Sequence, residues 1–251
     1  MWKRYKYLSE KILDYVLTHA AGAVAGTIEA ESILKRRGFT KPTMVLPQHG
    51  IDLESFQKKT VPPPQLTFLP KPIIAYVGRL EFEKGIHLLL EAAANVPGEW
   101  SLLVLGSGSA KEQLISLSEK LNIRHRVIFF EAVPHEEIPC YLGHVDILVL
   151  PSLTTENWKE QFGRVLVEAM ASGIPVIGSN SGAITEVIGD AGMVFNEGSS
   201  DDLSGKITVL FNDPSLLANY RRLGLKRVRE YYSDQSIGER LHAFLRNIVA
   251  S

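Results

Sequence analysis

The chain has 251 residues, of which 45% are apolar and 22% charged, and its formal net charge at pH 7 is −1. At roughly 150 residues per domain, this length predicts one large domain or one and a half, with a sizeable core. The composition is that of a globular protein and excludes disordered, collagen-like and disulfide-scaffold classes. The 27 Lys and Arg residues do not exceed the 28 Asp and Glu residues, which argues against nucleic-acid binding.

The single cysteine, Cys140, cannot form an internal disulfide, which suits a reducing compartment. No apolar run approaches the ~18 residues that span a bilayer, and the N-terminus lacks the form of a signal peptide. We therefore expect a soluble protein of a reducing compartment such as the cytoplasm, at most attached to a membrane surface. An N-terminal cluster is compatible with such contact, although a solvated terminus is the favoured interpretation; the cluster comprises Trp2, Lys3, Arg4, Tyr5, Lys6 and Tyr7.

The first 60 residues predict only one or two βα units. Helical patterns at 7–19 and 29–38 alternate with short apolar runs at 22–26 and 43–47. This is too little for a domain core, so we interpret residues 1–60 as the remnant of an N-terminal domain that is mostly absent from this chain. Residues 61–72 contain five prolines, which exclude a regular helix or a central strand, and we interpret them as an interdomain linker.

Beyond the linker, apolar runs alternate with amphipathic stretches. The runs are 73–78, 102–106, 126–130, 146–151 and 174–178. Such runs suit strands that are buried on both faces of a parallel sheet. Helical patterns lie at 84–96, 109–121, 200–212, 214–231 and 234–249. The alternation predicts an α/β fold with a Rossmann-like, doubly wound parallel sheet. We interpret the basic run at 221–230 as a solvated helix face.

Several common motifs are absent. Gly106-Ser107-Gly108 follows a strand as in a dinucleotide fingerprint, but Lys111 stands where the third glycine belongs. We find no P-loop, no nucleophile elbow and no Cys/His cluster with zinc spacing, and the segment at 135–137 (HEE) lacks the second histidine of a zinc protease. We therefore expect no metal. The other histidines are scattered, and we expect them to be surface or partly buried residues instead of metal ligands. They are His87, His125, His144 and His242.

Arg79 and Lys84 follow the first of these strands, in the segment GRLEFEKG at 78–85. Open α/β sheets bind ligands at the carboxyl ends of their strands. Two cations around the start of the next helix therefore suit a polyanion such as a diphosphate. The alternative, two solvated loop cations, is slightly favoured when this segment is considered alone.

Glu160 and Glu168 flank a helix that we expect to open at Phe162-Gly163. Eight helical residues span about 12 Å. This separation is too large for the two carboxylates of a retaining glycosidase, which lie about 5 Å apart. It suits two glutamates that bind the two ends of a long ligand. Each carboxylate can accept two hydrogen bonds from hydroxyl groups. Spacing alone nevertheless favours an amphipathic helix with exposed glutamates.

These segments resemble family 4 glycosyltransferases of the GT-B fold. The pattern E-x-F-G-x-x-x-x-E-A-M-A-x-G-x-P-V-I at 160–177, with GRLEFEKG upstream, is highly specific. The resemblance runs over residues 20–250. It implies retaining transfer of a hexose from a UDP- or GDP-sugar to an acceptor hydroxyl of a glycan or a lipid-linked sugar, with no metal or other cofactor.

The resemblance also implies the site. Residues 73–232 would be the nucleotide-sugar-binding domain and 233–251 a crossover helix. Arg79 and Lys84 would bind the donor diphosphate and Glu160 the transferred sugar, so we take these three as the catalytic residues. Glu168 would hold the ribose diol. The further donor-binding positions are Gly78, the base-reading backbone of Glu131, Ala132 and Val133, and the helix start at Phe162, Gly163 and Arg164, with Pro151 and Ser152 flanking the pocket.

The chain also departs from the family pattern. Glu131 stands where the family usually has glycine, so its side chain can crowd the base or change which base is accepted. Neither His19 nor His49 matches the first-domain histidine near the reacting centre. Four hypotheses stay open: a fragment that binds donor and transfers little alone, one half of a split enzyme with a partner chain, a non-catalytic nucleotide-sugar-binding module and, with a poorer fit, a sugar-nucleotide epimerase.

Overall fold

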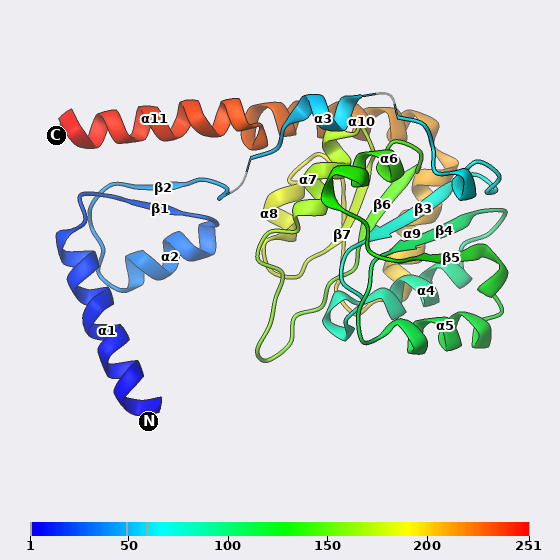
Figure 1. Cartoon of the computed structure of the whole chain (residues 1–251), viewed down its shortest axis with the longest axis horizontal. Coiled ribbons are helices and arrows are strands. Elements are labelled where there is room, and N and C mark those ends of the chain that lie inside the picture. Colours follow the sequence, from blue (N-terminus) through cyan, green and yellow to red (C-terminus); the bar gives the residue numbers. More distant parts are fainter. Residues whose placement is uncertain (1, 49, 59, 251) are drawn as a thin grey trace. The chain divides into compact units, whose positions relative to one another are not determined.

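The computed structural model describes residues 2–48, 50–58 and 60–250, and of residues 2–6 only the backbone (Figure 1). The chain divides into two compact units. The first contains Met1–Gly50 and Asp234–Ser251, and the second contains Ile51–Ser233.

The first unit contains α1 (Trp2–His19), β1 (Ala23–Ala25), α2 (Ile28–Arg36), β2 (Thr43–Val45) and α11 (Asp234–Ala250). The helices and short strands predicted for the first 60 residues are thereby confirmed. Strands β1 and β2 pair in parallel, and Thr27 caps α2 by accepting a hydrogen bond from the Ala30 N–H at 3.1 Å. His19 lies within this unit, with Nδ1 2.8 Å from the Tyr15 carbonyl oxygen, whereas His49 lies outside the described residues.

The N-terminal aromatic and basic cluster falls largely on residues whose side chains are not described. Of its six side chains only that of Tyr7 is described, and it is exposed. Membrane contact at this cluster therefore stays a prediction. The interpretation of residues 1–60 as the remnant of an N-terminal domain also stays a prediction, and residues 51–60 lie in the second unit.

The second unit is built on a six-stranded sheet, confirming the predicted α/β class with a doubly wound parallel sheet. Its strands are β3 (Ile73–Val77), β4 (Ser101–Leu105), β5 (Val127–Phe130), β6 (Ile147–Leu150), β7 (Val176–Ser179) and β8 (Met193–Phe195). They run in the order β5-β4-β3-β6-β7-β8, and all pairs are parallel. The order reverses between β3 and β6, which is where open α/β sheets form ligand crevices.

Helices cover both faces of this sheet (Figure 1). They are α3 (Leu53–Gln57), α4 (Ile86–Ala94), α5 (Lys111–Lys120), α6 (Ile138–Leu142), α7 (Arg164–Ala171), α8 (Ile184–Ile188), α9 (Ser200–Asn212) and α10 (Pro214–Arg227). Helix α4 packs against α5 and α9, while α7 packs against α3, α8 and α10. Every residue of β3, β4 and β6 is buried. This double coverage explains why these strands are uninterrupted apolar runs.

The helix predicted over 214–231 changes type before its end. Regular α10 stops at Arg227 and continues as a π-helical turn, Val228–Tyr232. Arg227 donates hydrogen bonds to the carbonyl oxygens of Glu186 and Val187 at 2.7 and 2.8 Å, which satisfies carbonyl groups at the end of α8. The interpretation of the basic run as a solvated face is therefore wrong for Arg227.

The proline-rich segment 61–72 lies in the second unit. It contains one short 3-10 turn, Pro64–Leu66, with Leu66 buried. The Pro70 carbonyl oxygen accepts a hydrogen bond from Ser101 Oγ at 2.9 Å. The interdomain role of this segment stays a prediction.

Candidate functional site

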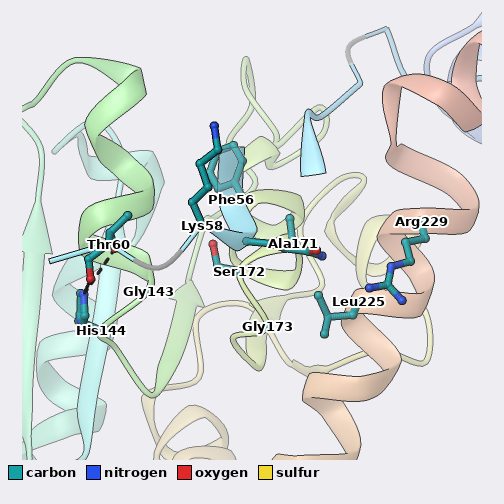
Figure 2. Close-up of a pocket in the computed structure, with 11 residues that line it drawn as sticks. Phe56, Lys58, Thr60, Gly143, His144, Ala171, Ser172, Gly173, Leu225 and Arg229 are labelled. Atoms are coloured by element: carbon teal, nitrogen blue, oxygen red, sulfur yellow. Dashed lines mark hydrogen bonds between the residues drawn. The ribbon is translucent and has the colours of Figure 1, made fainter. Parts of the chain in front are cut away.

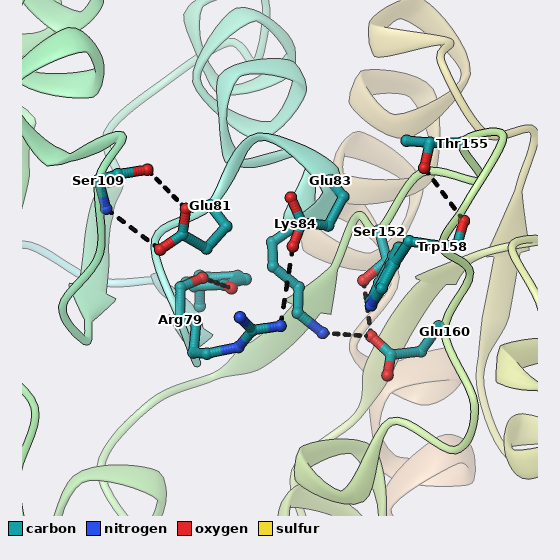
Figure 3. A network of polar contacts seen from close by, with 10 residues as sticks. Arg79, Glu81, Glu83, Lys84, Ser109, Ser152, Thr155, Trp158 and Glu160 are labelled. Atoms are coloured by element: carbon teal, nitrogen blue, oxygen red, sulfur yellow. Dashed lines mark hydrogen bonds and ion pairs between the residues drawn. The ribbon is translucent and has the colours of Figure 1, made fainter. Parts of the chain in front are cut away.

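The predicted cations and one predicted glutamate meet where the strand order reverses (Figure 3). Arg79 and Lys84 follow the carboxyl end of β3, and Glu160 follows the carboxyl end of β6. Because β3 and β6 are parallel neighbours, their carboxyl ends lie at the same edge of the sheet. The site is therefore placed by topology, from segments far apart in sequence.

Lys84 and Glu160 form a sheltered ion pair at this edge. Lys84 Nζ lies 2.7 Å from Glu160 Oε2, and the two side chains are only 14% and 11% exposed. The buried Ser152 hydroxyl donates to the same oxygen at 2.9 Å. Lys84 Nζ also lies 4.5 Å from the centroid of the Trp158 ring. The lysine is thus held between a carboxylate and an aromatic face.

Two glycines make this close approach possible. Gly85 has φ +67°, and a Cβ at this position would lie 1.9 Å from the Pro151 carbonyl oxygen. Gly182 has φ +54°, and its Cβ would lie 1.9 Å from the Glu160 carbonyl oxygen. That same oxygen accepts the Ala183 N–H at 2.9 Å. Only glycine fits both the backbone conformation and the contact at these positions.

Arg79 presents an open cation next to the pair. Its side chain is 63% exposed, and its nearest acidic partner is Glu83, at 3.7 Å. The Arg79 carbonyl oxygen accepts the hydroxyl of buried Tyr76 at 2.6 Å. Burial, assisted by the nearby Glu160 carboxylate, raises the pKa of Tyr76 above its usual range. Tyr76 therefore stays protonated near neutral pH and keeps anchoring the loop that carries Arg79.

Glu81 fixes the same loop from the other side. It accepts hydrogen bonds from the Ser109 N–H and hydroxyl at 3.2 and 2.6 Å. These bonds hold the pKa of Glu81 below its usual range. The loop after β3 is thus tied both to the core through Tyr76 and to the segment after β4.

Glu168 is buried, whereas the spacing of the two glutamates had favoured an exposed position on an amphipathic helix. It is 4% exposed, and its Oε1 lies 2.9 Å from Arg164 Nε and 2.8 Å from His135 Nε2. The estimate of 12 Å between the two glutamates is also wrong as derived, because α7 begins at Arg164 and Glu160 precedes it. Glu168 is nevertheless on α7, as predicted.

The helix start at 162–164 contains another glycine in the left-handed conformation. Gly163 has φ +75°, and its Cβ would lie 2.8 Å from the Leu150 side chain. The half-buried Phe162 ring packs edge-on against Tyr232, with ring centroids 5.8 Å apart. Helix α7 therefore begins close against the end of β6, with N–H groups of its first turn that need partners from outside the helix.

Glu131 lies at the end of β5 in a small polar network. It is exposed and forms an ion pair with Lys111, and it accepts a hydrogen bond from Ser107 Oγ at 2.9 Å. Ser107 Oγ in turn accepts the Ala132 N–H at 3.2 Å. The Lys111 hydrogen bond lowers the pKa of Glu131. Lys111, noticed in the sequence only as a missing glycine, thus anchors the residue that departs from the family pattern. Val133 beside it is half-buried.

Sequence reasoning missed three contacts of the site: Trp158 over Lys84, His135 on Glu168, and the bond from Ser152 to Glu160. Trp158 lies in the same loop as Glu160, so its place in that segment was a usable signal. His135 belongs to the HEE segment that was considered only as an incomplete zinc motif. Among the described residues, no three His, Cys, Asp or Glu side chains gather as a metal site. No helix in the described part of the chain is long and apolar enough to cross a bilayer.

Comparisons with known proteins assign the chain to a family. A family model described as "Glycosyl transferases group 1" matches residues 57–227. D-inositol 3-phosphate glycosyltransferase of Nocardia farcinica is 29% identical over 229 residues, which cover 85% of this chain and 49% of that protein.

Two solved structures share the fold. Sucrose-phosphate synthase from Thermosynechococcus elongatus superposes with a TM-score of 0.75 at 26% identity, covering 96% of this chain and 61% of that one. Anabaena Alr3699/HepE in complex with UDP has a TM-score of 0.79 at 21% identity, covering 93% and 66%. The chain thus spans about half of that curated relative and less than two thirds of either solved chain.

Proposed function

The chain belongs to the glycosyl transferases group 1, and we propose that it is the donor-binding half of a retaining family 4 glycosyltransferase. The donor is a UDP- or GDP-hexose, and the acceptor is a hydroxyl of a glycan or a lipid-linked sugar. The observation that carries this proposal is the Lys84–Glu160 pair at the reversal point of the sheet, with Ser152 and Trp158 around it.

The charges at the site match the reaction. Breaking the bond from sugar to phosphate leaves negative charge on the nucleoside diphosphate, and fixed cations stabilise such a leaving group. Lys84 is held in place by its neighbours, and Arg79 stands open beside it. The N–H groups of Phe162, Gly163 and Arg164 add hydrogen-bond donors for phosphate or sugar oxygens. The protein itself thus provides cationic stabilisation of the leaving group.

The two glutamates divide the rest of the donor between them. Glu160 Oε2 is engaged by Lys84 and Ser152, while its Oε1 accepts no hydrogen bond from a described residue; we assign it to hydroxyls of the sugar. Glu168 is oriented by Arg164 and His135 and holds the ribose diol. The backbone of Glu131, Ala132 and Val133 faces the base.

The domain assignment follows the same proposal. Residues 73–232 form the donor domain, and residues 51–72 and Ser233 belong to the same compact unit. Residues 1–50 and 234–251 belong to the acceptor side. Free Cys140 suits a cytoplasmic location.

Replacing each glutamate by glutamine separates their roles. Glu168→Gln is expected to weaken the binding of nucleoside diphosphates and of nucleotide-sugars by about tenfold, because a charge-assisted hydrogen bond is lost. Glu160→Gln is expected to weaken only the binding of nucleotide-sugars. Calorimetric titration with UDP, GDP and their hexose conjugates measures both, with exposed Glu112→Gln as the matched control. Unchanged affinities in both variants would remove the assignment.

A second assay distinguishes an enzyme from a binding module. A transferase half releases nucleoside diphosphate from its donor, either alone or when an acceptor-side chain is added. Donor binding with no release under any of these conditions would favour a non-catalytic nucleotide-sugar-binding module. No binding of any nucleotide-sugar would contradict both.

Glu131 is expected to influence the choice of base. Its carboxylate can accept the two adjacent N–H groups of guanine, whereas it repels the carbonyl oxygens of uracil. Glu131→Gly is therefore expected to shift the ratio of affinities towards UDP by about fivefold, roughly 1 kcal/mol. Competition between UDP and GDP measures the ratio. Glu99→Gly makes the same change at an exposed position outside any helix or strand, and it is expected to leave the ratio unchanged. An unchanged ratio in Glu131→Gly would show that this side chain does not face the base.

A further inference from the structure

The second unit has a cavity of about 490 Å³ at the amino ends of β6 and β7 (Figure 2). Its lining includes Lys58 and Arg229, but the Lys58 ammonium group points away from the Arg229 guanidinium group (Figure 2). His144, also in the lining, has its Nε2 2.9 Å from the Thr60 carbonyl oxygen. The described charged groups of this cavity therefore do not converge on one ligand. Polar groups converge instead at the carboxyl edge of the sheet, around the loop that carries Glu160.

This loop, residues 152–161, is called the Glu160 loop below, and both of its ends are bonded to the segment after β7. The Ser152 carbonyl oxygen accepts a hydrogen bond from the buried Ser179 hydroxyl at 2.5 Å. The Glu160 carbonyl oxygen accepts the Ala183 N–H at 2.9 Å. The middle of the loop is exposed, so its position depends on other contacts.

Glu197 supplies such contacts from the segment after β8. Its Oε2 accepts two hydrogen bonds from Thr154, one from the N–H and one from the hydroxyl group, both at 2.9 Å. The Glu197 N–H in turn donates to Asn180 Oδ1 at 2.8 Å, which holds the backbone that carries the carboxylate. Glu197 thus connects the segments after β6, β7 and β8.

The direction of these bonds follows from the number of protons. The single hydroxyl proton of Thr154 goes to Glu197, because a carboxylate can only accept. Ser181 Oγ lies 2.9 Å from the Thr154 hydroxyl oxygen and must therefore donate to it. Ser181 is fully buried, whereas Thr154 and Glu197 are exposed. The row of hydrogen bonds thus runs from the core to a carboxylate at the surface.

Thr154 is connected to Trp158 by a tight turn. The Thr155 N–H donates to the Trp158 carbonyl oxygen at 2.7 Å, and the Thr155 hydroxyl lies 3.5 Å from the same oxygen (Figure 3). Because this turn begins one residue after Thr154, a bond that holds Thr154 also holds the turn. The Trp158 ring lies over Lys84, with Nζ 4.5 Å from the ring centroid.

We propose that Glu197 is a positioning residue of the donor site, which keeps the Trp158 ring against Lys84 by holding Thr154. This role rests on the proposed function, in which Lys84 binds the donor diphosphate. A sheltered ammonium group, here only 14% exposed, interacts more strongly with a phosphate oxygen than a solvated one does. Glu197 acts through Thr154 and the turn, and not by contact with the donor.

The first test measures the position of Trp158 without any ligand. The chain contains three tryptophans, and each gives one ¹⁹F signal when the chain is labelled with 5-fluorotryptophan. The signals lost in Trp158→Phe and in Trp2→Phe identify Trp158 and, by elimination, buried Trp100. We expect Glu197→Ala to shift the Trp158 signal and to leave that of Trp100 in place, since alanine keeps the N–H bond to Asn180. No shift of the Trp158 signal, or an equal shift of the Trp100 signal, would overturn the proposal.

Two further variants separate position from charge. Glu197→Gln keeps an oxygen that can accept both bonds from Thr154, and it is expected to leave the Trp158 signal near its wild-type position. Glu156→Ala removes the same charge from an exposed position in the Glu160 loop, where the side chain has no hydrogen bond to a described residue. It is also expected to leave the signal in place. A shift in either variant as large as in Glu197→Ala would show an effect of charge and would overturn the proposal.

The second test measures the consequence for the donor site. Glu197→Ala is expected to weaken UDP binding by about threefold in calorimetric titration, and to have no further effect in a Lys84→Ala background, because both changes act on the same cation. An unchanged affinity of Glu197→Ala, or a loss that persists without Lys84, would overturn the role of Glu197. No UDP binding by the wild-type chain would contradict the proposed function instead, and the ¹⁹F signals would then decide by themselves whether Glu197 positions Trp158.

Discussion

Lys84→Ala is expected to weaken binding of UDP and GDP by about tenfold to a hundredfold. The alanine removes a charge-assisted hydrogen bond to the diphosphate worth roughly 1.5–3 kcal/mol. Because the lysine is only 14% exposed, water replaces it poorly. Isothermal titration with each nucleotide measures the loss.

The same substitution also leaves the Glu160 carboxylate unpaired, so folding must be measured alongside binding. Removing one partner of a sheltered ion pair costs stability, and Lys84→Ala combined with Glu160→Gln is expected to recover that stability without recovering nucleotide affinity. Lys120→Ala, at an exposed position in α5, controls for the loss of one positive charge. Recovery of nucleotide binding in the double variant would mean that Lys84 acts only by keeping Glu160 in place.

Gly85→Ala is expected to lower the free energy of unfolding by about 3 kcal/mol or more, within the range of severe single substitutions. Two effects add. The added Cβ would lie 1.9 Å from the Pro151 carbonyl oxygen, and φ is +67°. Because the clash is with backbone, relieving it requires the loops after β3 and β6 to separate. Urea unfolding followed by circular dichroism measures the change.

Gly98→Ala is the matched control for this substitution. Gly98 also has a positive φ, +84°, but nothing lies within 4 Å of its Cβ position. It isolates the conformational cost of alanine in the left-handed region, about 1–2 kcal/mol. Equal losses in the two variants would show that the contact with Pro151 contributes nothing to the requirement for glycine.

The fold could be predicted from local patterns to a large extent. Five strands of the main sheet were evident as apolar runs because residues such as those of β3, β4 and β6 are buried on both faces. Strand β8 was missed, since Met193–Phe195 has only three residues and two of them are half-buried. The change from α to π helix after Arg227 was missed too, because it leaves no mark in hydrophobic periodicity.

The chemistry of the site was predictable only in part. Arg79, Lys84, Glu160 and Glu168 could be singled out by their charge and by the motifs around them. The burial of Glu168 could not be predicted, because its partner His135 comes from a segment 33 residues away. The pairing of Lys84 with Glu160 joins residues 76 positions apart, and no local pattern encodes such a contact.

The sequence by itself therefore determined the fold class, the positions of most elements and the identity of the charged residues, because periodicity, glycines and charge are local properties. Tertiary structure alone decided which charges are sheltered and which are open. The parallel pairing of β3 with β6 brings their loops together, so that Lys84 forms a sheltered ion pair with Glu160 while Arg79 stays exposed.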